Sequence, residues 1–139
     1  MPPTRALALL AIVPILLLGS CGNDPIGMDN RMALRAFGLC QHAQALQLTD
    51  NVIERGRERN AQQALMLKAA ILQDQGENVA AEALYPRIAE TWEAVKRRAL
   101  PPEQREREIA VFIDVARNER IAQGLSPTCD DEPTQPAKP

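Results

Sequence analysis

Residues 61–75 read AQQALMLKAAILQDQ, a run whose apolar positions recur at the three- and four-residue spacing of an α-helix. One line of side chains comprises Ala61, Leu65, Ala69 and Leu72, and a second line beside it comprises Ala64, Leu67 and Ile71. Asn60 is a preferred N-cap residue, and Gly76 suits the position just past a helix end. The sequence therefore predicts a helix over residues 61–75 with a broad apolar face.

Helical patterns extend on both sides of this segment. No proline occurs between Pro25 and Pro86, and residues of high helix propensity dominate. No segment alternates apolar and polar residues as a strand would. Further helices are expected over residues 30–55, 78–98 and 102–123. The predicted fold class is therefore all-α, a bundle of four or five helices.

Two of these expected helices contain a position where the chain could break. Residues 30–55 carry apolar stripes on two sides in one register, which favours a single helix, and a split at Thr49-Asp50-Asn51 is the alternative. Pro86 falls on the polar face of the helix expected over residues 78–98, where water can satisfy the freed carbonyl. We therefore expect a kink at Pro86 rather than a break.

Length and composition limit the classes of protein to which the chain can belong. Its 139 residues allow one domain, and the 45% of hydrophobic residues argue against disorder of the whole chain. A net charge of −2 provides no basic field for a nucleic-acid backbone, and an aromatic content of 3% is too low for a base-stacking surface. We expect a folded body over residues 29–125 and no nucleic-acid partner.

The N-terminal segment is typical of an export signal. Arg5 precedes an apolar run over residues 6–18, ALALLAIVPILLL. This run of 13 residues is too short for a membrane-spanning helix, which needs about 20, and Pro14 weakens a permanent span further. The pattern predicts a secretory signal peptide.

Leu18-Gly19-Ser20-Cys21 resembles the lipobox of bacterial lipoproteins. The resemblance implies that residues 1–20 are a cleaved signal peptide and that Cys21 is acylated as the new N-terminus. Residues 21–28 would then be a lipidated tether, which several acyl chains hold stably in a membrane. Gly22 implies sorting to the outer membrane, facing the periplasm, rather than retention at the inner membrane. An ordinary signal peptide with an unmodified cysteine is the alternative.

Residues 65–85 resemble one helical hairpin of the tetratricopeptide repeat. The matching positions are Leu65, Ala69, Leu72, Gly76, Ala81 and Tyr85. Small residues stand where two antiparallel helices would cross, and glycine stands at the turn between them. Residues 33–52 and 69–88 share four apolar positions at a spacing of 36 residues. Tetratricopeptide-like hairpins and an irregular helical bundle both fit this pattern.

Cys40 and Cys129 form an even pair once Cys21 is assigned to a lipid. In an oxidising compartment we expect a disulfide between them, which would hold the C-terminal segment against the first helix. Two free thiols are the alternative. Cys40 and His42 are spaced like a pair of metal ligands, but no second ligand pair accompanies them. Residues 126–139 are expected to form an acidic, proline-rich tail that is mostly disordered beyond Cys129.

No group of residues has the spacing of a catalytic, cofactor-binding or metal site. His42, the only histidine, falls on a polar strip and is expected to be exposed. Tyr85 and Trp92 lie along one edge of the helix expected over residues 78–98. Core packing is the default for both aromatic residues, and contact with a partner is the alternative, because aromatic side chains anchor many interfaces.

The leading hypothesis is a non-enzymatic, lipid-anchored periplasmic protein that binds another protein. It would act as an adaptor or accessory subunit of an envelope assembly for secretion, pilus formation, efflux or outer-membrane biogenesis. The alternatives are a helical lipoprotein that binds a small molecule or a lipid, and a lipoprotein that acts as an exclusion or inhibitor factor.

Overall fold

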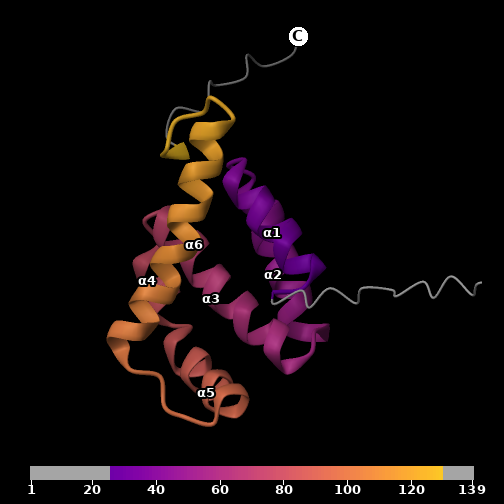
Figure 1. The fold of residues 1–139 in the computed structure, drawn as a ribbon, viewed down its shortest axis with the longest axis vertical. Coiled ribbons are helices and arrows are strands. Elements are labelled where there is room, and N and C mark those ends of the chain that lie inside the picture. The colour runs from indigo at the N-terminus through magenta and orange to yellow at the C-terminus, as the bar shows by residue number, and fades with distance from the viewer. Residues whose placement is uncertain (1–25, 130–139) are drawn as a thin grey trace, which may run out of the picture.

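The computed structural model describes residues 26–129, and within this range every regular element is an α-helix (Figure 1). The helices in chain order are α1 (Met28–Gly38), α2 (His42–Arg55), α3 (Glu58–Asp74), α4 (Asn78–Glu82), α5 (Tyr85–Lys96) and α6 (Pro102–Ala122). Five of them have eleven residues or more, and α4 is a single short helix of five residues. The prediction of an all-α bundle is confirmed.

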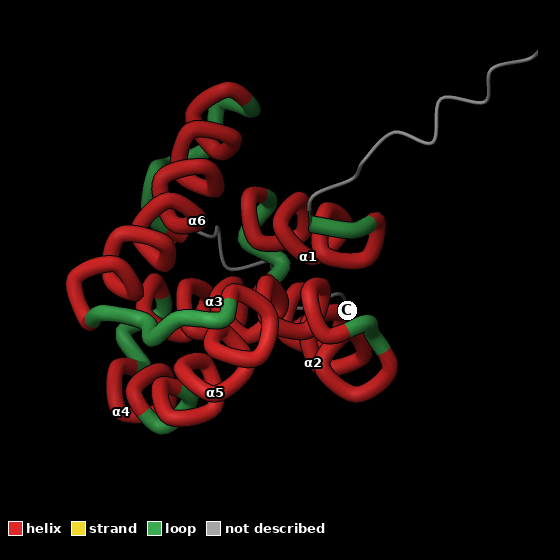
Figure 2. Tube along the Cα trace, turned by 60° about the horizontal axis from the view of Figure 1, so that its bottom comes forward, coloured by secondary structure: helices red, strands yellow, loops and turns green. Residues whose placement is uncertain are grey.

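Helix α3 lies at the centre of the bundle and packs against α1, α2, α5 and α6 (Figure 2). Its buried residues are Gln62, Ala64, Leu65, Met66, Leu67, Ala69, Ala70, Ile71 and Leu72. A helix that is apolar around most of its circumference is stable only when neighbours cover it. The helix starts at Glu58, one turn earlier than the sequence predicts, so Asn60 is not its N-cap. The backbone oxygen of Asn60 instead accepts a hydrogen bond from Asn30 Nδ2, at 2.9 Å.

The single helix expected over residues 30–55 is wrong, because the chain turns between α1 and α2. Cys40 has a φ of 60°, and the amide of Gln41 donates to the carbonyl oxygen of Ala36 at 2.9 Å. This pattern closes the end of α1 and reverses the chain. The alternative split at residues 49–51 is also wrong, since these residues lie inside α2. Each of the two apolar stripes is therefore divided between α1 and α2, which pack against each other.

Pro86 begins a helix instead of kinking one. It lies in the first turn of α5, where a proline loses no intrahelical hydrogen bond and its φ suits the helix. Helix α4 has already ended at Glu82, so the helix expected over residues 78–98 is divided in two. Gly76, with a φ of 79°, makes the turn from α3 to α4. The small residues Ala69 on α3 and Ala81 on α4 are both fully buried.

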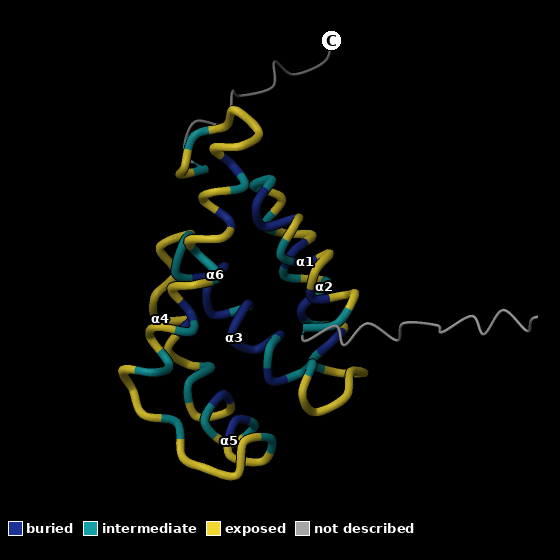
Figure 3. Tube along the Cα trace, in the orientation of Figure 1, coloured by how far each residue is buried: buried dark blue, intermediate teal, exposed yellow. Residues whose placement is uncertain are grey.

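Helix α6 covers one side of the bundle and extends beyond it (Figures 1 and 3). It spans Pro102–Ala122, close to the predicted residues 102–123. Only Ile109, Ala116 and Arg120 are buried on this helix, and its outer face is exposed. Most of the apolar core therefore comes from the other helices.

Candidate functional site

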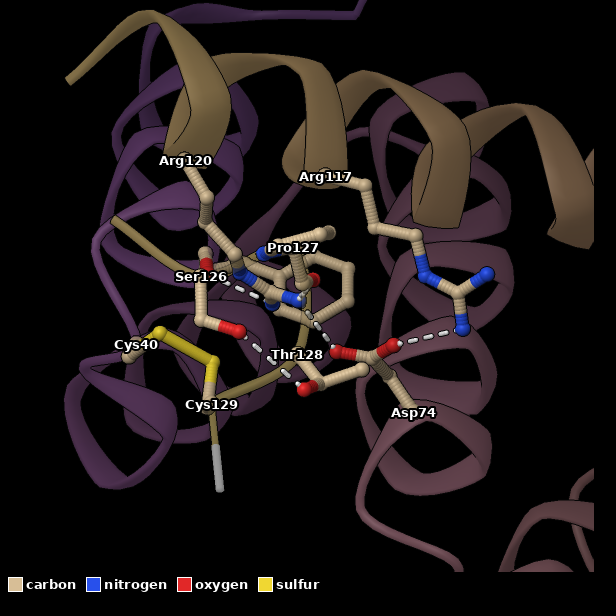
Figure 4. The surroundings of a disulfide bond; sticks show 9 residues. Cys40, Asp74, Arg117, Arg120, Ser126, Pro127, Thr128 and Cys129 are labelled. Carbon is tan, nitrogen blue, oxygen red and sulfur yellow. Dashed lines mark hydrogen bonds and ion pairs between the residues drawn. A yellow bond between two sulfur atoms is a disulfide. The ribbon is translucent and has the colours of Figure 1, made fainter. Parts of the chain in front are cut away.

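Cys40 and Cys129 form a disulfide, as the cysteine count predicts (Figure 4). The bond joins the turn after α1 to the segment after α6, across 89 residues of sequence, and the two Cα atoms are 5.6 Å apart. The C-terminal segment is therefore held against the end of α1. Cys21 and residues 130–139 lie outside the described residues, so acylation and the predicted tail stay predictions.

A buried arginine lies beside the disulfide, and sequence reasoning missed it (Figure 4). The side chain of Arg120 is completely buried, and its Nη1 lies 2.8 Å from Asp74 Oδ2. Its Nη2 donates to the carbonyl oxygen of Phe37 at 3.0 Å, and Nη1 donates to that of Pro127 at 2.9 Å. The guanidinium carbon also lies 5.0 Å from the centre of the Phe37 ring. One side chain thus joins α1, α3, α6 and the C-terminal segment.

Asp74 completes this cluster from the end of α3. Its side chain is almost fully buried, and its second oxygen, Oδ1, pairs with Arg117 Nη2 at 3.2 Å. Arg117 and Arg120 are three residues apart on α6, so both point to the same carboxylate. That spacing was the one available signal in the sequence. It was not sufficient, because any of the acidic residues could have been the partner.

Donor atoms of His42, Asp74 and Cys129 lie within 4.8 Å of one another, which is close enough to consider a metal. Each carboxylate oxygen of Asp74 already pairs with an arginine, and the sulfur of Cys129 is bonded to Cys40. His42 is half-buried, with its ring centre 6.0 Å from that of Phe37, so the expectation of an exposed histidine is wrong. These contacts make the group a structural cluster that fastens the segment after α6 to the bundle.

Trp92 packs in the core, where its side chain is 3% exposed. Lys96 Nζ and the guanidinium carbon of Arg98 lie 5.5 and 5.9 Å from the ring centre. These cations shield the outer side of the indole at the end of α5. A partner would meet the cations before the ring, and direct contact with Trp92 stays a prediction.

Tyr85 is half-buried at the start of α5, at the opposite end of that helix from Lys96. Arg105 of α6 lies over its ring, 3.7 Å from the centre, and Gln73 Nε2 donates to the phenolic oxygen at 2.8 Å. Burial and the charge of Glu106 raise the pKa of Tyr85, although the hydrogen bond from Gln73 opposes this shift. Tyr85 thus connects α3, α5 and α6.

The clefts between the helices of residues 26–129 include the following three. A cleft of about 310 Å³ separates α1 from α6, and its lining comprises Arg31, Leu34, Arg35, Val115 and Glu119. A second, of about 280 Å³, is lined by Asp29, Leu48, Asn51, Val52, Arg55 and Gly56. The third is the largest of the three, at about 350 Å³, and its lining comprises Ile53, Gly56, Glu58, Ala61, Arg87, Glu90, Thr91 and Ala94. It lies between α5 and the turn that joins α2 to α3.

Comparison with protein-family models, with curated proteins and with solved structures finds no significant match. Between residues 26 and 129, none of the helices combines the length and the apolar character that crossing a membrane requires.

Proposed function

We propose that this chain is a lipid-anchored adaptor of an envelope assembly, held at the outer membrane through Cys21 and facing the periplasm. The cleft between α5 and the α2–α3 turn carries this proposal. It combines apolar side chains, among them Ile53 and Ala94, with the charged side chains of Arg87 and Glu90. Protein–protein interfaces commonly combine apolar and polar side chains in this way.

The helices around this cleft are well suited to present a binding surface. α3 is covered on most sides, and the disulfide with the buried Arg120 fastens the segment after α6 to the bundle. Residues held on such helices keep their positions better than residues on loops, so less order must be gained when a partner binds. In this proposal, the acylated Cys21 attaches the protein to the membrane, and the preformed cleft on the bundle binds the partner.

The anchor is tested by labelling growing cells with a fatty acid that carries a detectable tag. We expect the label on the wild-type chain and none on the Cys21→Ser variant, which should also keep its signal peptide. Gly19→Ala, a small-for-small change beside the cysteine, is the matched control and should label normally. A Cys21→Ser chain that is processed as usual would contradict the anchor.

The cleft is tested by placing a photo-crosslinking amino acid at Arg87 or Glu90, both of which are exposed. We expect the same protein adduct from both positions in intact cells, and no such adduct from the exposed residue Asp114 on α6. The charge-swapped variant Arg87→Glu/Glu90→Arg should lose the partner while retaining the helical circular dichroism spectrum. Equal adducts from all three positions would argue against a specific cleft. A small molecule retained at the cleft, with no protein adduct, would favour the ligand-binding class.

A further inference from the structure

We propose that this chain binds one Zn²⁺ ion when Cys40 and Cys129 are reduced. The proposal concerns the chain before the disulfide forms, because both cysteines leave the ribosome as thiols and no reductant is then needed. It is independent of the anchor and of the cleft beside α5. The four ligands come from parts of the chain that meet at one end of the bundle, and they are Cys40, His42, Asp74 and Cys129.

The sequence contains half of a zinc site, and the fold supplies the other half (Figure 4). Cys40 and His42 have the spacing of a ligand pair, but no second pair lies near them in sequence. In the fold, donor atoms of His42, Asp74 and Cys129 lie within 4.8 Å of one another, and the sulfur of Cys129 adjoins that of Cys40. Thiolate, imidazole and carboxylate groups are the ligands that Zn²⁺ takes in proteins.

The positions of these groups suit a tetrahedral ion. Ligand atoms at about 2.0–2.3 Å from Zn²⁺ lie about 3.3–3.8 Å from one another. Since the donor atoms of His42, Asp74 and Cys129 lie within 4.8 Å of one another, side-chain movements of about 1 Å bring them to that spacing. The Cα atoms of Cys40 and Cys129 are 5.6 Å apart, so both sulfurs can reach the same ion. Both cysteines are half-buried, which leaves the ion a path from solvent.

Arg120 holds the two cysteines near each other without the disulfide. Its Nη2 donates to the carbonyl oxygen of Phe37, three residues before Cys40, at 3.0 Å. Its Nη1 donates to the carbonyl oxygen of Pro127, two residues before Cys129, at 2.9 Å. Reduction therefore breaks one of several links between the end of α1 and the segment after α6. A site whose ligands are already assembled needs less ordering when the ion binds.

The charges around the site favour this ligand set. Two thiolates and one carboxylate exceed the charge of Zn²⁺ by one negative charge, which the buried guanidinium of Arg120 offsets. Asp74 keeps Oδ2 on Arg120, at 2.8 Å, and offers Oδ1 to the ion in exchange for Arg117. The side chain of Arg117 is 45% exposed and lies 3.2 Å from Oδ1, so this is the weaker of the two ion pairs.

His42 is positioned by the fold to serve as the nitrogen ligand. It is the first residue of α2, and its ring centre lies 6.0 Å from that of Phe37. An imidazole ligates a metal through one nitrogen and keeps a hydrogen-bond partner on the other. Coordination by His42 is therefore compatible with further contacts of the ring.

Co²⁺ is the probe, because its visible absorption reports the geometry and the thiolate ligands of a zinc site. The full chain carrying Cys21→Ser has these two cysteines alone. We would reduce it in detergent with a phosphine, remove the phosphine without air and titrate with Co²⁺. We expect one Co²⁺ per chain, with tetrahedral and thiolate-to-cobalt bands, and no such bands for the disulfide form. Zn²⁺ should displace the Co²⁺ and raise the urea midpoint of the reduced chain, because it binds the folded state.

Variants test the ligands one at a time. Cys129→Ser should abolish the tetrahedral bands, and His42→Gln should weaken Co²⁺ binding by at least about 10-fold, since even the loss of an outer partner of a ligand costs that much. Arg117→Gln removes the competitor for Asp74 Oδ1 and should bind Co²⁺ at least as tightly as the parent chain. Asp114→Asn, at an exposed position on α6, is the control and should bind normally.

Several results would overturn the proposal. A reduced, folded chain that gives no tetrahedral bands has no such site. Bands of equal strength and affinity in urea, where the chain is unfolded, would show that the cysteines bind without the fold. Normal binding by His42→Gln, or weaker binding by Arg117→Gln, would show that the ligand set is wrong. Circular dichroism on each reduced variant separates a lost ligand from a lost fold.

Discussion

Arg120 and Asp74 form a buried ion pair between α6 and the end of α3, with 2.8 Å between Nη1 and Oδ2. The pair is supported by further contacts, because Arg120 also donates to the carbonyl oxygens of Phe37 and Pro127. Two buried charges are tolerated when each finds a partner and further hydrogen bonds. Both Nη atoms of Arg120 have such partners, whereas its Nε has none among the described residues. The cluster explains how a small bundle holds a segment that follows its last helix.

Removing one member of this pair should strongly destabilise the fold. Arg120→Met keeps much of the side-chain volume but leaves Asp74 with Arg117 as its remaining ion-pair partner among the described residues, and we expect a loss of about 3–5 kcal/mol in the free energy of unfolding. Urea denaturation followed by circular dichroism measures the loss. The control is Asp50→Asn, which breaks the more exposed pair of Asp50 with Lys68 and should cost less than about 1 kcal/mol. Equal losses would contradict the role of burial.

The disulfide should contribute mainly by restricting the unfolded chain. For a closed loop of 89 residues, the chain-entropy relation gives about 4.6 kcal/mol. We expect the urea midpoint to fall when dithiothreitol is added to the wild-type chain and to stay constant for Cys40→Ser/Cys129→Ser. A thiol assay on the unfolded, unreduced mature protein should detect neither cysteine. Two reactive thiols in that assay would show that the bond does not form.

The stability of the protein should decline at alkaline pH in a way that depends on Tyr85. Its pKa is raised in the folded state by burial and by Glu106, so the unfolded chain releases this proton first. The stabilisation is complete below the unfolded pKa of about 10 and is lost as the pH rises through the higher folded value. Tyr85 is the single tyrosine, so phenolate absorbance gives its titration directly. Glu106→Gln should lower the pKa, and a pKa below 10 in the wild type would refute this prediction.

Gln62 should be replaceable by an apolar residue with a gain in stability. Its side chain is buried in α3, and within residues 26–129 neither its Nε2 nor its Oε1 has a hydrogen-bond partner. Gln62→Met has a similar shape and removes both unsatisfied groups, so we expect a gain of about 1–3 kcal/mol in the free energy of unfolding. Gln123→Met, at an exposed position after α6, is the control and should change little. A destabilised Gln62→Met variant would reveal a partner for the amide.

Gly38 should not accept a side chain, although alanine is the better helix former. A Cβ atom at this position would lie 2.8 Å from Cγ and 3.0 Å from Cβ of Glu119, so α1 and α6 would have to separate. Overpacking of this kind outweighs the gain in helix propensity, and we expect a loss of about 1–3 kcal/mol for Gly38→Ala. The double variant Gly38→Ala/Glu119→Gly should recover part of it. Thermal unfolding of the two variants distinguishes this crowding from an effect of the backbone alone.

The sequence was sufficient for helices whose local pattern is strong. Period and propensity predicted helices over residues 61–75 and 102–123. The broad apolar face of the first and the proline at the start of the second can be recognised from neighbouring residues alone. Cysteine parity predicted the bond between Cys40 and Cys129, because two cysteines allow a single intrachain pairing once Cys21 is set aside.

The tertiary structure decided where the long helices end and which charges meet. The break at Cys40 has no strong local signal, since a positive φ is uncommon at a residue other than glycine, and the disulfide to Cys129 joins this turn to a segment far away in sequence. The burial of Arg120 was likewise unpredictable, because arginine is normally exposed and its partners Phe37 and Asp74 are far away in sequence. Local periodicity determines which segments are helical, but only the packing of distant segments determines which polar groups can be buried, because each of them must find its partner there.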